Sequence, residues 1–138
     1  MFKIVTDTNP SIDDIMTVRK GIINFNDRAL HYESKSLAIF MKDNNDVIQG
    51  GVLAWLDASS IYIEILWINE QLRHQGYGSK LLHAAEDEGK KNNCQFSTLD
   101  TFGFQAEDFY VKNGYEKLGE VKNYIRQYSR IFFRKTLK

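Results

Sequence analysis

The chain has 138 residues, 43% of them hydrophobic, and its 18 lysines and arginines balance 18 aspartates and glutamates. We expect one domain, residues 1–138, with a core large enough to fold without disulfides, and no net positive field to bind nucleic acid. The first residues lack the apolar core of a signal peptide, and no apolar run approaches the roughly 18 residues of a membrane span. Together with a single cysteine, Cys94, this predicts a cytoplasmic protein without a membrane partner.

The N-terminal half predicts a short strand, one helix and three further strands. Residues 2–6 have the pattern of the short strand, and Ser11 is the expected N-cap of a helix whose apolar residues recur at spacings of three and four. Polar, hairpin-like turns at residues 42–46 and 57–60 separate the next strands. These strands are expected at residues 37–41, 47–56 and 61–68.

The C-terminal half predicts alternating helices and strands. Leu81, Leu82 and Ala85 should form the apolar face of a helix over residues 79–91, with Glu86 on its polar face. The later elements are a strand at 96–100, a helix at 106–112, and strands at 115–121 and 130–137. The loop before the last strand would hold Tyr124, Arg126, Tyr128 and Arg130. The order β-α-β-β-β-α-β-α-β-β predicts an α/β fold with a mixed sheet and helices on both faces.

A glycine-rich turn at residues 73–78, Arg-His-Gln-Gly-Tyr-Gly, joins a strand to a helix. The first N–H groups of a helix lack partners within it, and the helix dipole adds partial positive charge, so a phosphate fits there. Gly76 and Gly78 would let the main chain approach that phosphate, and Arg73 and Lys80 would add charge. The alternative is that both glycines serve only tight turning and close packing.

The spacing of this turn excludes two nucleotide-binding motifs. The dinucleotide fingerprint needs a third glycine where the chain has Leu81. The Walker P-loop needs Gly-Lys followed by Ser or Thr, whereas Gly78 is followed by Ser79, Lys80 and Leu81. A pyrophosphate cradle remains, beyond the carboxyl end of the strand at 61–68, where ligands bind in such sheets.

Two sequence blocks resemble those of the GCN5-related N-acetyltransferases, the GNAT family. The turn fits the family signature of Gln or Arg, two residues, Gly, one residue, and Gly or Ala. A second block further along the chain has an alanine, an aromatic-Tyr pair, a lysine and a Gly-aromatic pair in the family order. Its residues are Ala106, Phe109, Tyr110, Lys112, Gly114 and Tyr115. The resemblance covers most of the chain. Within the family, the chain is similar to small bacterial members.

This resemblance implies an enzyme that transfers an acetyl group from acetyl-CoA to an amine, either a small molecule or a protein amino group. In the family, the pyrophosphate binds the main chain of the turn and the pantetheine arm pairs with the preceding strand. Gly103 stands where the family often has an asparagine that bonds this arm, so Gln105 is expected to bond the arm in its place. The implied donor-binding residues are Leu66, Trp67, Ile68, Arg73, His74, Gln75, Gly76, Tyr77, Gly78, Ser79, Gln105 and Tyr110.

The resemblance also assigns Tyr110 as the acid that protonates the departing thiolate, since a phenol with a pKa of about 10 keeps its proton at neutral pH. Two carboxylates and an ordered water compete for the role of base. Glu64 lies among apolar residues that should raise its pKa, and Asp100 ends the next strand. In a regular strand Tyr62, Glu64 and Leu66 share one face, whereas a bulge, common here in the family, would turn Glu64.

Two other functions stay open: a CoA-binding regulatory or interaction module without turnover, and a scaffold that binds no nucleotide. His31, His74 and His83 are too dispersed for a metal motif, so no metal is expected. Because the family commonly pairs through sheet edges and helices, the resemblance includes a homodimer among the expected states.

Overall fold

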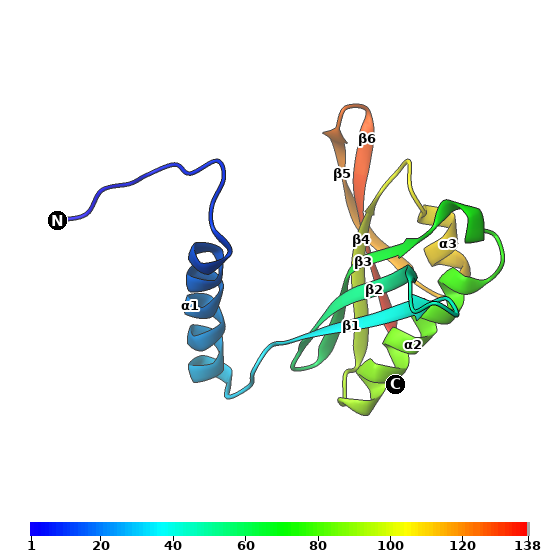
Figure 1. Cartoon of the computed structure of the whole chain (residues 1–138), viewed down its shortest axis with the longest axis horizontal. Helices are drawn as coiled ribbons and strands as arrows, with labels where there is room; N and C mark the ends of the chain where they lie inside the picture. The colour runs from blue at the N-terminus through cyan, green and yellow to red at the C-terminus, as the bar shows by residue number, and fades with distance from the viewer. Residues whose placement is uncertain (138) are drawn as a thin grey trace. The chain divides into compact units, whose positions relative to one another are not determined.

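The structure is a computed structural model that describes residues 1–137. These residues belong to two compact units, Met1–Ser34 and Lys35–Lys138 (Figure 1).

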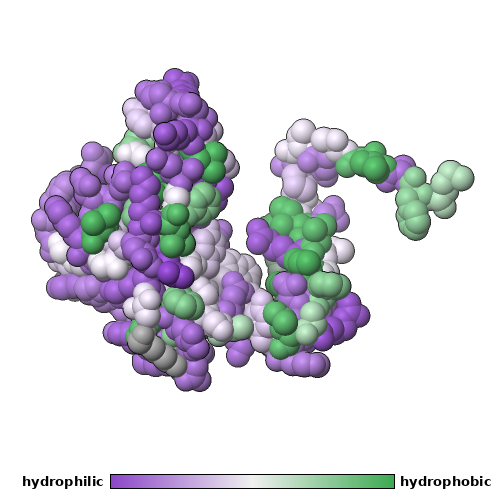
Figure 2. Space-filling model, turned by 180° about the vertical axis from the view of Figure 1, so that it is seen from behind, coloured by the Kyte–Doolittle hydropathy of each residue, from purple (hydrophilic) through white to green (hydrophobic). Residues whose placement is uncertain are grey.

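The first unit contains a single helix, α1 (Ile12–Leu30). The side chain of Ser11 accepts a hydrogen bond from the Asp14 N–H at 3.1 Å, which confirms the predicted N-cap. No residue of α1 is buried, and one side of the helix carries exposed apolar residues (Figure 2). The strand predicted at residues 2–6 is wrong, since this segment has no regular secondary structure. A strand is stabilised by pairing with neighbours, and residues 2–6 make no such pairing.

The second unit is built on a six-stranded sheet in the order β1-β2-β3-β4-β6-β5. The β3–β4 pair is parallel and the other pairs are antiparallel, so the expected α/β fold with a mixed sheet is confirmed. The strands are β1 (Lys35–Lys42), β2 (Ile48–Asp57), β3 (Ser60–Ile68), β4 (Phe96–Phe102), β5 (Glu116–Ile125) and β6 (Tyr128–Thr136).

Two helices and one short 3-10 turn complete this unit. The turn η1 (Glu70–Leu72) leads from β3 into α2 (Tyr77–Lys91), which lies along one face of the sheet, and α3 (Glu107–Lys112) follows β4 (Figure 1). Leu81, Leu82 and Ala85 of α2 are buried, as predicted. Apolar residues of the strands complete the core beneath them: Val52, Ala54, Ile61, Ile63, Leu99, Ile131 and Phe133.

Glu86 lies on the buried side of α2, and its predicted place on the polar face is wrong. It is 4% exposed and accepts hydrogen bonds from the Tyr115 hydroxyl at 2.9 Å and from Lys135 Nζ at 2.8 Å. Leu82 and Gly89, four residues before and three after, are also buried, so this position faces the core despite its charge.

Strands β3 and β4 pair only over their first halves. The last paired residues are Ile63 and Leu99, after which the two strands separate. At the same place the β2–β3 ladder slips, because Ala54 pairs with Ile63 while Leu53 pairs with Ile65. This bulge leaves Glu64 unpaired, and the opening between β3 and β4 begins beside it.

The hairpin of β5 and β6 is longer than predicted. The structure places Tyr124 on β5 and both Tyr128 and Arg130 on β6, and only residues 126 and 127 form the turn. The predicted loop is therefore wrong at Tyr124 and Tyr128, whereas Arg130 lies on β6 within the predicted strand 130–137. Tyr128 and Arg130 are paired in the β5–β6 ladder.

Candidate functional site

The glycine turn leaves the N-terminus of α2 open. Gly76 is the N-cap residue, with φ of +85° and no side-chain cap. The first main-chain donor within this turn is Lys80, whose N–H bonds to the Gly76 carbonyl at 3.2 Å. The N–H groups of Tyr77, Gly78 and Ser79 therefore have no acceptor within the helix, and no acidic residue occupies its first turn. Such an end favours an anion.

The two glycines of the turn serve different purposes. Gly76 has a left-handed backbone, and a Cβ built there would meet nothing within 4 Å, so its surroundings are free for a ligand. A Cβ on Gly78 would lie 3.2 Å from the Phe109 ring and 3.4 Å from Ile68 Cδ1. Gly78 thus lets α2 pack closely on α3. The alternative that the glycines serve close packing therefore fits Gly78 and not Gly76.

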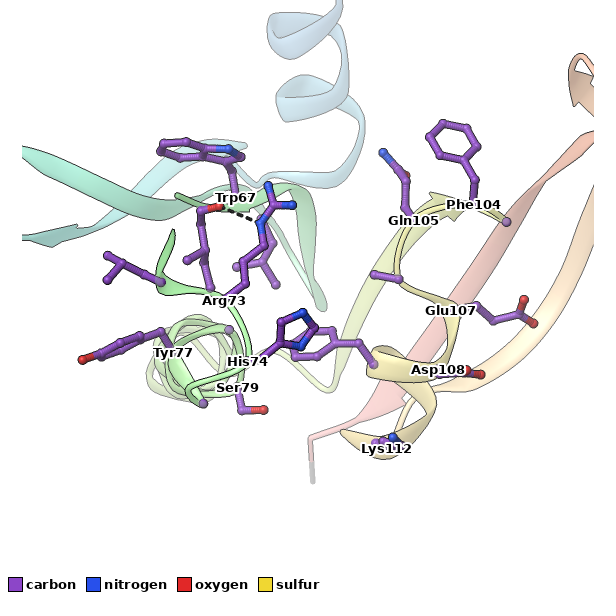
Figure 3. A pocket seen from close by; sticks show the side chains of 18 residues that line it. Trp67, Arg73, His74, Tyr77, Ser79, Phe104, Gln105, Glu107, Asp108 and Lys112 are labelled. Carbon is purple, nitrogen blue, oxygen red and sulfur yellow. Dashed lines mark hydrogen bonds between the residues drawn. The ribbon is translucent and has the colours of Figure 1, made fainter. Parts of the chain in front are cut away.

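A cavity of about 970 Å³ extends from this turn between β3, α2 and the loop before α3 (Figure 3). Its volume suits a ligand of cofactor size. Arg73, His74 and Tyr77 lie on one side of it, and Phe104 and Gln105 on the other (Figure 3). The predicted donor-binding residues that line it are Leu66, Trp67, Ile68, Arg73, His74, Gly76, Tyr77, Gly78, Ser79 and Gln105.

The side chains of two predicted turn residues, Arg73 and Gln75, donate hydrogen bonds to main-chain carbonyl groups. Arg73 Nε donates to the Ile68 carbonyl at 3.1 Å, which holds its guanidinium beside the last residue of β3 (Figure 3). Gln75 does not line the cavity, and its Nε2 donates to the Gln71 carbonyl at 3.3 Å. His74 has a φ of +62°, so the main chain turns sharply at this residue.

A second, smaller cavity of about 210 Å³ opens where β3 and β4 separate. It brings together the three predicted catalytic residues, Glu64 from β3, Asp100 from β4 and Tyr110 from α3. Leu66, Gln105 and Ala106 line both cavities, so the two adjoin.

Tyr110 is held firmly within the protein. It is 7% exposed, and its ring contacts those of Phe109, Tyr115 and Phe133. Burial, with a smaller contribution from the negative charge of Asp100, raises the pKa of Tyr110 to about 12. The phenol therefore keeps its proton throughout the neutral range.

Both carboxylate oxygens of Asp100 have partners. Arg130 Nε donates to one at 2.9 Å and the Tyr62 hydroxyl to the other at 2.9 Å. Burial, followed by the hydrogen bond to Asp100, raises the pKa of Tyr62 to about 12. The hydrogen bond to Asp100, followed by that to Tyr124, raises the pKa of Arg130 above its already high value. Asp100 is thus an anchored anion.

Glu64 is more exposed than its apolar neighbours in the sequence predict. A regular strand would put Tyr62, Glu64 and Leu66 on one face, but the structure has the bulge that was the alternative. The bulge leaves Glu64 on the same side of β3 as Tyr62, whereas Leu66 packs toward the core. Glu64 Oε2 accepts the Trp55 indole N–H at 3.0 Å. One carboxylate oxygen is therefore fixed, and Oε1 receives no hydrogen bond from residues 1–137.

Gln105 is oriented by the end of β4. Its Oε1 accepts hydrogen bonds from Thr101 Oγ1 and from the Phe102 N–H, both at 2.9 Å. A main-chain N–H can only donate, so this pairing fixes which end of the amide is oxygen. The Nε2 group remains a donor at the junction of the two cavities.

Trp55, Tyr62 and Arg130 are not among the predicted catalytic or donor-binding residues. Each donates a hydrogen bond to a predicted catalytic carboxylate, Glu64 or Asp100, from a neighbouring strand. Only the sheet register, which pairs Trp55 with Tyr62 and Arg130 with Phe102, brings them beside Glu64 and Asp100.

Among the described residues, no group of three or more His, Cys, Asp or Glu side chains could hold a metal ion. Across residues 1–137, no helix combines the length and the apolar character that crossing a membrane requires.

Comparisons with known proteins identify the family and the fold. The sequence model of the acetyltransferase (GNAT) family matches residues 4–115. Acetyltransferase Atu2258 of Agrobacterium fabrum is 28% identical over 89 residues, covering 64% of this chain and 65% of that protein. The match thus spans slightly less than two thirds of that relative.

Solved structures extend the similarity over nearly the whole chain. An acetyltransferase from Bacillus cereus superimposes with a TM-score of 0.77 at 30% identity, covering 96% of this chain and 97% of that one. A structure from Agrobacterium tumefaciens shares the fold with a TM-score of 0.88 at 23% identity, covering 99% of each chain. An aminoglycoside 6′-N-acetyltransferase solved with coenzyme A also shares it, with a TM-score of 0.68 at 17% identity over 75% of this chain and 73% of that one. This chain belongs to the acetyltransferase (GNAT) family.

Proposed function

We propose that this protein transfers an acetyl group from acetyl-CoA to a primary amine, of a small molecule or a protein, by direct attack within a ternary complex. The observation that carries the proposal is the pair of adjoining cavities. The larger ends at the open N-terminus of α2, and the smaller holds Tyr110 with Glu64 and Asp100. Family membership, and the coenzyme A bound to a fold neighbour, support acetyl-CoA as donor.

The donor would be held mainly by the main chain. The pyrophosphate accepts hydrogen bonds from the free N–H groups of Tyr77, Gly78 and Ser79, each contributing about 1.5–3 kcal/mol because the acceptor is charged. The pantetheine arm pairs with residues 66–68 of β3, on the edge that β4 leaves open. Gln105 Nε2 donates to a carbonyl of that arm. The thioester is then directed toward the smaller cavity.

Tyr110 is proposed as the acid. The amine nitrogen attacks the thioester carbon, a C–N bond forms, and the C–S bond breaks with its electron pair moving to sulfur. Tyr110 donates its proton to that thiolate and regains one from solvent. Its raised pKa means that the phenol is protonated when attack occurs.

Glu64 is proposed as the group that takes the proton from the attacking amine, directly or through a water molecule. Its free Oε1 can accept a proton, while Trp55 fixes the other oxygen. Asp100 is proposed instead as a fixed anion, since Tyr62 and Arg130 use both of its oxygens. The two carboxylates are thus proposed to have different roles, although they compete equally for the role of base on sequence alone.

We also propose that residues 1–138 act as one acetyltransferase domain. The family match from residue 4 to residue 115 runs through both compact units, which supports a single functional module.

Tyr110→Phe tests the proposal, because it removes the hydroxyl and keeps the ring that packs in the core. We expect kcat for acetyl transfer to fall about 100-fold or more, as is typical for loss of a positioned acid, while the Kd for acetyl-CoA changes little. Thiol release and calorimetric titration measure the two quantities. Unchanged turnover would remove Tyr110 from the mechanism, and binding of acetyl-CoA without turnover by the wild type would favour the regulatory module.

A further inference from the structure

Four aromatic rings gather at the end of β4 and on the β5–β6 hairpin. Phe102 stacks on Phe104 and on Tyr124 with centroid distances of 5.7 and 5.8 Å, and Tyr128 meets Phe104 edge-on at 5.0 Å. These four residues are called the aromatic wall below. Phe104, Tyr124 and Tyr128 are 52%, 49% and 38% exposed. So much exposed ring surface in one place marks a binding surface.

The aromatic wall adjoins the larger cavity through Phe104 and is linked to the smaller one through Arg130. Phe104 itself lines the larger cavity, and Asp100 lines the smaller one. Arg130 connects Asp100 to the wall, since its Nη1 donates to the Tyr124 hydroxyl at 3.0 Å and its guanidinium lies 5.2 Å from the Tyr124 ring centre. The Arg130–Asp100 pair therefore connects the wall to the cavity that holds Tyr110.

The charges of the site are unevenly compensated. Arg130 pairs with Asp100 at 2.9 Å, so that carboxylate is neutralised within the protein. Glu64 accepts only the neutral indole of Trp55 among residues 1–137. A protonated amine would be attracted to Glu64, because an opposite charge within a few ångströms favours the charged form.

We propose that the acetyl acceptor is a small primary amine carrying an aromatic or heteroaromatic ring, with the amine beside Glu64 and the ring against the aromatic wall. This inference rests on the acetyl transfer proposed above and names its substrate class. Offset and edge-to-face contacts between rings add to the burial of apolar surface, so an aromatic ring gains more here than a saturated ring of the same size. The wall offers ring faces and edges, whereas a peptide acceptor would require main-chain partners.

A matched amine panel tests the proposal on the intact protein. The panel contains 2-phenylethylamine, tryptamine, 2-cyclohexylethylamine, hexylamine and a short peptide with an N-terminal alanine and no aromatic residue. We expect kcat/KM for 2-phenylethylamine to exceed that for 2-cyclohexylethylamine by about threefold to tenfold, the contribution expected of an aromatic contact. Released CoA gives the rate, and the mass of the product confirms N-acetylation.

Two variants locate the preference on the aromatic wall. Phe104→Leu and Tyr128→Leu should bring the ratio between the two ring amines close to one. Phe40→Leu is the matched control, since Phe40 is 50% exposed on β1 and lines neither cavity. This control should keep the wild-type ratio.

Each outcome bears on the inference. A wild-type ratio near one, a ratio that the wall variants leave unchanged, faster acetylation of the peptide, or no acetylation of any amine in the panel would overturn it. Acetylation of aliphatic amines or the peptide without ring preference refutes the inference alone and leaves the proposed acetyl transfer intact. Failure to bind acetyl-CoA, seen as no shift in melting temperature, refutes the proposed function instead.

Discussion

At the scale of single residues, the site distinguishes two carboxylates that look equivalent in the sequence. Glu64 and Asp100 each follow the last residue that its strand pairs in the β3–β4 ladder, Ile63 and Leu99 respectively. Arg130 and the Tyr62 hydroxyl occupy both carboxylate oxygens of Asp100. Glu64 accepts one hydrogen bond, from the Trp55 indole, and its Oε1 receives none from residues 1–137.

The first prediction compares Glu64→Gln with Asp100→Asn. Glu64→Gln keeps an oxygen for the Trp55 indole and removes the proton acceptor, so kcat should fall about 100-fold or more. Asp100→Asn keeps an oxygen for Arg130 or Tyr62 but removes the paired charge, so the loss should be smaller and shared with KM. Steady-state kinetics of both variants with one amine give the comparison. A larger fall of kcat in Asp100→Asn would reverse the two roles.

The second prediction concerns pH and Tyr110. Its pKa rises from an ordinary 10.0 to about 12, so at pH 10 only about one molecule in a hundred has lost the proton, against half for an unshifted tyrosine. The acid should therefore stay active as pH rises to 10 and be lost only on approaching 12. We expect kcat, measured with saturating acetyl-CoA and amine, not to decline between pH 8 and 10. A decline with an apparent pKa near 10 would contradict the assignment.

At the scale of elements, the cradle depends on how α2 is anchored. Glu86 of α2 accepts from Tyr115, which precedes β5, and from Lys135 on β6, and Ser97 of β4 shares the Tyr115 hydroxyl at 2.7 Å. This network connects the helix to β4, to β6 and to the residue that precedes β5. Its satisfied hydrogen bonds hold α2 in one position, and hence the N–H groups at its N-terminus.

The third prediction is that Tyr115→Phe destabilises the protein. The change leaves Glu86 Oε2 and Ser97 Oγ buried without their partner, which costs about 1–3 kcal/mol of the free energy of unfolding. Urea denaturation should show a lower midpoint with the same slope. Glu116→Gln is the control, because its pair with Arg134 is exposed and such pairs contribute about 0–1 kcal/mol. Equal effects of the two changes would argue against the network.

The elements themselves could be predicted from the sequence, because their signals are local. Alternation and helical spacing placed the strands at 37–41, 47–56 and 61–68 and the helix at 79–91 within a few residues of their bounds. Glu86 could not be placed, since its partners lie 29 and 49 residues away along the chain. The strand prediction for residues 2–6 was wrong for a related reason, because a strand pattern does not determine whether a partner strand exists.

The same distinction holds for the candidate site. Tyr110 and the turn at residues 73–78 could be predicted because each lies in a short sequence block that resembles those of the family. Arg130 reaches Asp100 only through the register of β4 and β6. The bulge at Glu64 was foreseen only as an alternative, since nothing in the strand itself marks where the ladder slips.

At the scale of the whole molecule, the proposed donor site joins parts that are distant in sequence. The larger cavity is lined by β3, η1, the start of α2, and the segment from Gly103 to Lys112. A ligand that contacts all of these can bind only when they are assembled. Binding to the folded state alone raises stability in proportion to the logarithm of ligand concentration over Kd.

The last prediction follows from this linkage and tests the cradle directly. Acetyl-CoA at one hundred times its Kd should stabilise the fold by about 2.7 kcal/mol. For a chain of this size, that energy raises the melting temperature by about 10 °C. S-acetylpantetheine at the same concentration is the matched control, because it keeps the thioester and the pantetheine arm but lacks the pyrophosphate. If the N–H groups at the start of α2 supply most of the affinity, this compound should produce a much smaller shift. Equal shifts would place the affinity in the arm along β3, and no shift with either compound would argue for a scaffold that binds no nucleotide.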